Sequence, residues 1–320
     1  MVISRRNLGR LAFVSLPGAK MFGAMGAPTT INSKIAGVQI GAQTYSFRTM
    51  PEVEDVIKAM VRIGLGEAEL MSEHAEAVAG APPQPARDRS GPPSPEQREA
   101  MRAAMQAHAE EMKKWRASLS MDKFKGVRKR FDDAGINIAL VTYNMNERTP
   151  DDEIEYAFQM ARVLGVQAIT TSTQVSMAKR IAPFADKHQM LVGFHGHDAT
   201  DKPDEVSTPE TFAAVMSASK YHRVNLDIGH FVAAGYDPVA YIKEHHDKIT
   251  NLHLKDRKKN HGANLPWGEG DTPIKEVLQL VAKEKYGFPC NIEFEYRVPE
   301  GSDVITEVGK CFKYCKDALA

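Results

Sequence analysis

The sequence predicts an α/β fold, a single-domain (β/α)8 barrel, and three observations lead to that prediction. Apolar strand-like segments and amphipathic helical segments alternate about eight times. That count, without hairpin signals between the strands, favours a closed parallel barrel over a doubly wound sheet. In the second half of the chain, four strand-like segments each end in a His, Asp or Glu side chain. A length of 320 residues suits one barrel of this kind.

The first half of the barrel is expected to contain four strands, at 38–45, 68–71, 136–143 and 166–173. The segment 51–63 repeats apolar residues at a helical spacing, which predicts a helix after the first strand. Another helix begins near Pro150, where acidic residues occupy the first turn. A helix at 177–188 leads into the second half.

The second half repeats the same alternation of strand and helix. Its strand-like segments lie at 191–198, 224–230, 249–256 and 290–295. The apolar spacing predicts helices at 208–219, 237–246, 274–286 and 304–319. Each strand is therefore followed by a helix that can cover the sheet from outside.

One segment interrupts the alternation of strands and helices after the second strand. Residues 77–95 are rich in Pro, Gly and Ala, and a long polar helix is expected at 96–117. We treat 78–120 as an insertion on the side where barrel loops build active sites. A lid, a dimer contact and a tolerated excursion all remain open as its role.

The first 30 residues read as a leader that precedes a barrel domain at 36–320. Arg5 and Arg6 precede a weakly apolar run that ends in small residues, a pattern typical of a twin-arginine export signal. This pattern predicts a periplasmic protein. A disordered basic leader on a cytoplasmic protein is the alternative.

Composition narrows the class of partner. The formal net charge is zero, so the chain lacks the excess of basic residues expected of a nucleic-acid binder. This favours a small-molecule substrate. No run of 18 or more apolar residues is present, so no integral membrane span is expected. The three cysteines are interpreted as buried thiols, and a homo-oligomer is compatible with this composition.

The four strand ends carry His195, Asp227, His253 and Glu293. Because side chains alternate along a strand, all four can point toward the barrel axis. Burying such groups unpaired would be costly, so we expect them to bind one divalent ion: Mn, Co, Zn, Mg or Fe. In the alternative interpretation each is a hydrogen-bonded structural residue, and Asp227 caps the following loop.

A metal site with open positions can chelate neighbouring oxygens of a sugar, while a nearby carboxylate removes a proton next to a carbonyl. The resulting enediolate leads to isomerisation, epimerisation or β-elimination. Glu293, beside the ion, and Glu69, at the end of the second strand, are candidate catalytic carboxylates. A paired structural role for Glu69 is the alternative.

Four more polar residues lie beside the expected ligands. His230 is placed to hydrogen-bond a substrate oxygen, and Lys255 is placed to neutralise an oxyanion unless it only pairs with Asp256. We expect His197 and Glu295 to contact substrate, with a supporting position behind the ligands as the alternative for Glu295.

From residue 38 onward the chain resembles the sugar phosphate isomerase/epimerase superfamily, the xylose isomerase-like TIM barrels. The matching motifs lie at 41–48, 194–198, 227–230, 253–256, 268–270 and 292–293. This resemblance implies a metal-dependent sugar isomerase or epimerase whose ion is held by the fifth to eighth strands. The motifs also contain Tyr45 and Glu269, which we expect to contact substrate.

The fifth-strand ligand departs from the epimerase pattern. Ketose epimerases of the superfamily have a glutamate there that also acts as base, whereas this chain has His195. The histidine is similar to exported members that act on oxidised sugars, including 3-keto-glycoside lyases. A non-catalytic carbohydrate-binding barrel is the alternative from another class. Endonucleases of the endonuclease IV type share the barrel but need more inward ligands and a DNA-binding face.

Overall fold

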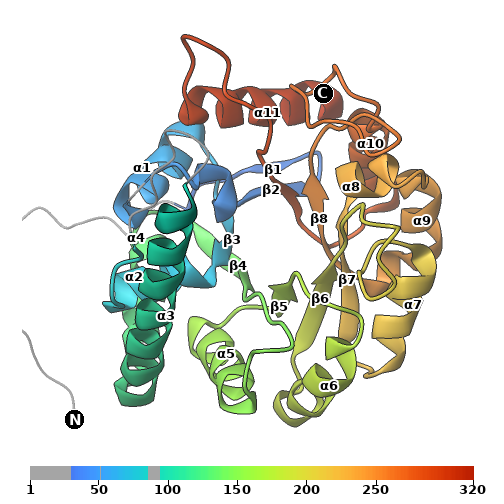
Figure 1. Cartoon of the computed structure of the whole chain (residues 1–320). Helices are drawn as coiled ribbons and strands as arrows, with labels where there is room; N and C mark the ends of the chain where they lie inside the picture. The colour runs from blue at the N-terminus through green and yellow to red at the C-terminus, as the bar shows by residue number, and fades with distance from the viewer. Residues whose placement is uncertain (1–29, 51, 86–93) are drawn as a thin grey trace, which may run out of the picture.

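The computed structural model describes residues 30–50, 52–85 and 94–320. Eight parallel strands, β2 to β9, form a closed barrel inside a ring of helices (Figure 1). Pairing between β2 and β9 closes the sheet, with Ile40 beside Cys290 and Ala42 beside Ile292. The predicted single-domain (β/α)8 TIM barrel is confirmed. The proposed twin-arginine leader lies outside the described residues.

The barrel strands are β2 Val38–Gln43, β3 Glu67–Met71, β4 Asn137–Thr142, β5 Ala168–Thr171, β6 Leu191–His195, β7 His222–Asp227, β8 Ile249–Leu254 and β9 Cys290–Ile292. The helices around them are α1 Val53–Ile63, α2 Ser72–Ala79, α3 Pro95–Ser118, α4 Lys123–Asp133, α5 Asp151–Leu164, α6 Met177–His188, α7 Pro209–Ser217, α8 Ile228–Ala233, α9 Pro238–His245, α10 Ile274–Glu284 and α11 Val304–Leu319. A short antiparallel strand, β1 Lys34–Ile35, precedes β2.

Several strands end earlier than the sequence suggests. β2 stops at Gln43, whose side-chain oxygen accepts a hydrogen bond from the Tyr45 amide and starts a 3-10 turn at Thr44–Phe47. β9 stops at Ile292, so Glu293 and Glu295 lie just beyond the strand rather than within it. The short helix α8 was not predicted. It begins directly after Asp227, whose carboxylate accepts a hydrogen bond from the His230 amide at 2.7 Å.

The inserted helix is confirmed as α3, which begins with a capping box formed by Ser94 and Gln97. It lies on the outside of the barrel beside α2 and α4 (Figure 1). Arg116 near its end pairs with Glu76 of α2 at 2.7 Å and with Glu153 of α5 at 2.8 Å. The insertion is therefore anchored to two barrel helices by one cation.

The apolar core lies mainly between the strands and the helices. Phe124, Phe131 and Phe158 are fully buried there. The three cysteines are buried free thiols, as predicted. Among the described residues, no helix is both long enough and apolar enough to cross a bilayer.

Glu67, at the start of β3, gives a pH-dependent prediction. Burial raises the pKa of this carboxyl to about 7, an effect that Glu69 reinforces and that Asn137 and Lys34 oppose. The folded state therefore resists ionising a group that ionises freely in the unfolded chain above pH 4.5. This cost is absent at pH 4, grows as the pH rises to 7 and is complete above it.

We expect Glu67→Gln to stabilise the protein by about 2–3 kcal/mol at pH 8 and to have almost no effect at pH 4. Urea unfolding of both proteins at the two pH values measures the difference. Equal unfolding midpoints at pH 8 would show that burial does not perturb this carboxyl.

Candidate metal centre

Four buried side chains converge at the carboxyl end of the barrel. Each of His195, Asp227, His253 and Glu293 offers one ligand atom, and these atoms all lie within 4.8 Å of one another. They come from β6, the end of β7, β8 and the residue after β9. The predicted quartet is therefore brought together as expected.

The spacing of these atoms suits a metal ion. His195 Nε2 lies 3.5 Å from Asp227 Oδ2 and 3.7 Å from Glu293 Oε2, and His253 Nδ1 lies 3.1 Å from the same glutamate oxygen. Ligands about 2.1 Å from a tetrahedral ion lie about 3.4 Å apart. His195 Nε2 is buried and has no hydrogen-bond partner among the described residues, and the buried Asp227 Oδ2 forms ion pairs there but no hydrogen bond. The cluster can therefore hold a divalent ion.

Lys255 supplies positive charge to the same carboxylates. Its Nζ lies 3.0 Å from Asp227 Oδ2, 2.8 Å from Glu293 Oε2 and 2.6 Å from Glu295 Oε2. Burial alone would lower the pKa of Lys255, but these carboxylates outweigh it and hold that pKa well above its usual range. The expected alternative, a pair with Asp256, is not what the structure shows, because the Asp256 carboxylate binds backbone amides of the following loop.

Glu69 lies fully buried beneath the cluster and holds His253. Its Oε2 is 2.6 Å from His253 Nε2, and it also accepts hydrogen bonds from the amides of Asn251 and Asn291, each at 2.9 Å. Its Oε1 accepts from Thr170 at 2.6 Å. Burial would raise the pKa of Glu69, but His253 and these donors together lower it. These contacts favour a positioning role, in which Glu69 fixes which nitrogen of His253 faces the ion.

Three asparagines of this polar layer were missed in the sequence. Asn225, Asn251 and Asn291 each lie two residues before an expected ligand. All three direct their amide nitrogen toward Glu69 or toward His253. Because alternate residues of a strand share a face, an Asn-x-ligand pattern in three successive strands predicts such a layer. That signal was present in the sequence.

Two further histidines lie beside His195: the ring centroid of His197 is 4.9 Å from that of His195, and the centroid of His230 is 5.9 Å from it. His197 Nδ1 lies 2.8 Å from Glu205 Oε1, which leaves Nε2 facing Ser172 Oγ at 3.4 Å. Burial lowers the pKa of His197 to about 3, with His195 and His230 adding to the effect. Its side chain is 32% exposed, so a substrate can reach the ring.

His230 is fixed by Lys255 and by two neighbours to which the sequence analysis gave no role, Asp198 and Arg257. Its Nε2 lies 3.1 Å from Lys255 Nζ, and its Nδ1 lies 3.3 Å from Asp198 Oδ1 and 2.6 Å from Arg257 Nη1. Asp198 and Arg257 also pair at 2.9 Å, which joins the loop after β6 to the loop after β8.

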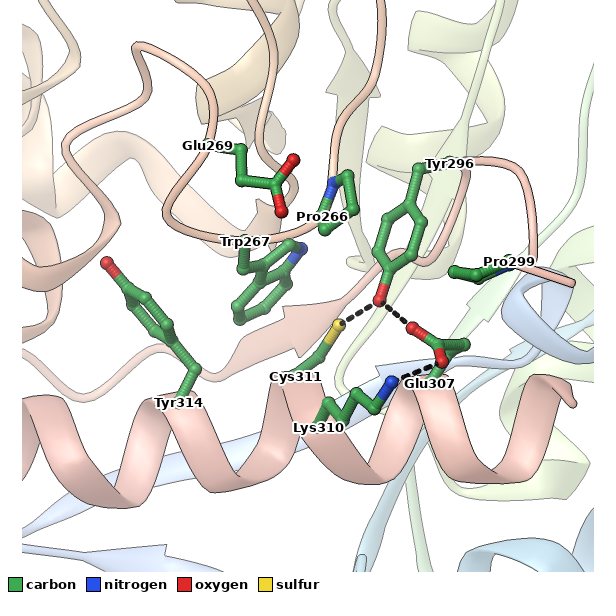
Figure 2. Close-up of a pocket in the computed structure, with 9 residues that line it drawn as sticks. All are labelled: Pro266, Trp267, Glu269, Tyr296, Pro299, Glu307, Lys310, Cys311 and Tyr314. Carbon is green, nitrogen blue, oxygen red and sulfur yellow. Dashed lines mark hydrogen bonds and ion pairs between the residues drawn. The ribbon is translucent and has the colours of Figure 1, made fainter. Parts of the chain in front are cut away.

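The remaining predicted residues are placed differently. Glu295 contacts Lys255 and keeps 23% of its side chain exposed at the cluster's edge. Tyr45 is exposed just beyond β2 and lies against Arg48. Glu269 is not in the cluster: it lines a second pocket, between the loop after β8 and α11 (Figure 2). Substrate contact by Tyr45 and Glu269 stays a prediction.

Together, the fold and the site define a (β/α)8 barrel with a buried His/Asp/Glu cluster at its carboxyl end. A profile of the xylose isomerase-like TIM barrel family matches residues 73–314. The chain belongs to this family, as the sequence motifs indicated.

Curated relatives match only part of the chain. The inosose dehydratase of Clostridium tetani is 25% identical over 160 residues, which cover 44% of this chain and 52% of that protein. The inosose dehydratase of Clostridium botulinum is 29% identical over 130 residues, covering 35% and 42%. The chain thus spans about half the length of these relatives.

Solved structures share the fold at low identity. The probable 3-DHS dehydratase AsbF of Bacillus anthracis has a TM-score of 0.59 and 15% identity, with 87% of this chain and 99% of that chain covered. The IolI protein, solved with a bound zinc atom, has a TM-score of 0.59 and 13% identity, with 88% and 98% covered. A sugar phosphate isomerase/epimerase of Parabacteroides distasonis has a TM-score of 0.56 and 18% identity, with 91% and 97% covered.

Proposed function

We propose that the protein is a divalent-metal-dependent carbon–oxygen lyase. It removes the proton next to the carbonyl of a keto-sugar or keto-cyclitol and expels the oxygen on the β carbon. The observation that carries this proposal is the pairing of the four-ligand cluster with a histidine, His197, oriented by Glu205. The dehydratase names of the relatives support elimination as the outcome.

His197 is the proposed base. Because its Nδ1–H donates to the Glu205 carboxylate, the Nε2 lone pair is directed to the substrate side. Nε2 takes the proton from the carbon next to the carbonyl, the carbon–carbon double bond forms, and the β carbon–oxygen bond breaks with its electron pair on oxygen. The imidazolium then returns the proton to that oxygen, so water or an alcohol leaves and the histidine is ready for another turnover.

The developing negative charge on the carbonyl oxygen needs positive charge nearby. His195, Asp227, His253 and Glu293 would hold the ion, which when bound supplies Lewis acidity and chelates neighbouring substrate oxygens. Lys255 holds Glu293 and Glu295 in place and adds a fixed positive charge at the edge of the site. Both ring nitrogens of His230 contact protein groups, Nε2 the Lys255 ammonium and Nδ1 the Asp198–Arg257 pair, so His230 helps to hold Lys255 in place beside the site.

Isomerisation or epimerisation of a ketose is the second candidate. It shares the first proton transfer and is favoured by the structural likeness to a sugar phosphate isomerase/epimerase. It differs in the last step, because the proton returns to carbon and no oxygen leaves. A non-catalytic carbohydrate-binding barrel would transfer no proton at all.

The test uses the metal-loaded protein with an inosose and with a 3-keto-glycoside in heavy water. We expect exchange of the proton next to the carbonyl and release of water or aglycone, followed by NMR and by the absorbance of the unsaturated ketone. His197→Gln should lower kcat about 100-fold or more, with metal binding unchanged.

The matched control is His246→Gln, an exposed histidine stacked on Tyr286 just before the start of β8, whereas His253 lies near the other end of that strand. It should leave turnover unchanged. Proton exchange without release of oxygen would identify an isomerase or epimerase instead. Sugar binding with neither exchange nor release would contradict both enzymatic functions.

A further inference from the structure

The second pocket lies outside the metal centre, between the loop after β8 and helix α11 (Figure 2). Its volume is about 270 Å³. Pockets for drug-sized ligands hold about 300–1,000 Å³, so this one suits a single small ring. None of the four cluster residues lines it.

We propose that this pocket binds a pyranose ring, as a second carbohydrate site distinct from the metal centre. Its occupant is a neutral sugar unit, free or as part of a glycoside. Binding at this pocket does not require the metal ion or the lyase activity proposed above.

Two aromatic rings provide the apolar surface that a sugar needs. Trp267 and Tyr314 form an edge-to-face pair, with their centroids 5.8 Å apart and their planes at 86°, and both line the pocket (Figure 2). One face of a pyranose consists mostly of C–H groups and packs on an aromatic ring with little ordering cost. Pro266 adds a third apolar wall.

A hydrogen-bond acceptor and a hydrogen-bond donor, neither paired with a described protein group, lie beside these rings. Glu269 lines the pocket and is exposed, and its carboxylate takes part in none of the hydrogen bonds or ion pairs found among the described residues. The indole N–H of Trp267 takes part in none of them either. A carboxylate accepts hydrogen bonds from sugar hydroxyls, and an indole N–H donates to a ring or hydroxyl oxygen.

On the opposite wall of the pocket, the Glu307 carboxylate already has protein partners. Glu307 is buried, accepts a hydrogen bond from Tyr296 at 2.8 Å and pairs with Lys310 at 2.7 Å. This wall is therefore a rigid boundary, and its lysine disfavours a cationic occupant. Glu269 is the carboxylate left to receive a ligand.

The loop that carries Trp267 and Glu269 is held in place by Asp256. The Asp256 carboxylate accepts hydrogen bonds from the amides of Gly268 at 2.8 Å and Gly270 at 3.0 Å. A side chain at Gly270 would collide with Asp256, which explains the glycine. The pocket is thus preformed, and binding pays little for ordering the loop.

The two tryptophans of the chain make the pocket directly observable. Trp115 lies on the inserted helix α3, so in the Trp115→Phe variant all tryptophan emission comes from Trp267. We expect methyl β-D-glucopyranoside and cellobiose to change that emission saturably, with a millimolar dissociation constant. Adding Glu269→Gln should weaken binding about 10-fold, because hydrogen bonds to a charged acceptor are the stronger ones.

The controls separate this site from the metal centre. Saturation-transfer NMR on the otherwise wild-type protein should lose the sugar signal with Trp267→Ala and keep it with Lys258→Met, a surface substitution outside the pocket lining. The emission change should survive His253→Ala, which removes a cluster ligand. The proposal is overturned if millimolar glycosides leave the emission unchanged, if His253→Ala abolishes the response, or if only a quaternary ammonium ion produces it.

Discussion

Replacing Lys255 with methionine should destabilise the metal-free protein by about 3–5 kcal/mol, because it leaves buried carboxylates without their cation. Asp227 and Glu293 are both within 3.0 Å of the ammonium and both buried. A divalent ion would supply positive charge to the same oxygens. We therefore expect added metal to stabilise Lys255→Met more than it stabilises the wild type, and turnover to fall.

Urea unfolding with and without the ion measures this difference. Lys258→Met is the matched control, since Lys258 pairs with Asp271 at 3.3 Å on the surface and an exposed pair contributes little. It should change neither stability nor the response to metal. If the ion stabilised Lys255→Met and the wild type equally, Lys255 and the metal would not share carboxylates.

Replacing Glu69 with glutamine should weaken metal binding about 10- to 100-fold, although Glu69 itself offers no ligand atom. The carboxylate accepts from His253 and from the amides of Asn251 and Asn291. A glutamine amide would direct an N–H group at one of these donors. His253 would lose the partner that fixes its Nδ1 toward the ion.

Titration of the metal against a chromophoric chelator gives the affinity, with circular dichroism to confirm folding. Glu67→Gln is the matched control on the same strand and should leave the affinity unchanged. If Glu69→Gln does not fold, Thr170→Val removes one hydrogen bond to Glu69 and should shift the affinity in the same direction by less. Unchanged affinity in a folded Glu69→Gln protein would rule out this positioning role.

Much of the fold could be predicted from the local pattern of apolar and polar residues. Alternating apolar segments gave the strand order, and period-two alternation placed His195, Asp227, His253 and Glu293 on one face. The helix α8 was missed because it is a six-residue helix that begins at a strand end, too short to show a helical period. The end of β9 at Ile292 was missed because apolar content continues through Phe294.

The roles of individual residues depended on contacts between distant parts of the chain. The sequence placed Glu69 at a strand end but left open whether it acts on substrate or forms a structural pair with other side chains. Its partners Asn251 and Asn291 could not be identified because they lie 182 and 222 residues away along the chain. The position of Glu269 also depends on the tertiary structure. Its motif matched the superfamily, yet the loop after β8, tied down by Asp256, carries it to a different pocket.

The sequence by itself determined the barrel, the ligand quartet and the face on which it lies, because strand alternation is a local property of the backbone. Tertiary structure decided which carboxylate supports His253, which carboxylates share Lys255 and which histidine is oriented as a base. Those assignments depend on how the closed sheet staggers its strands and on where the loops fold back. Local spacing carries no information about either.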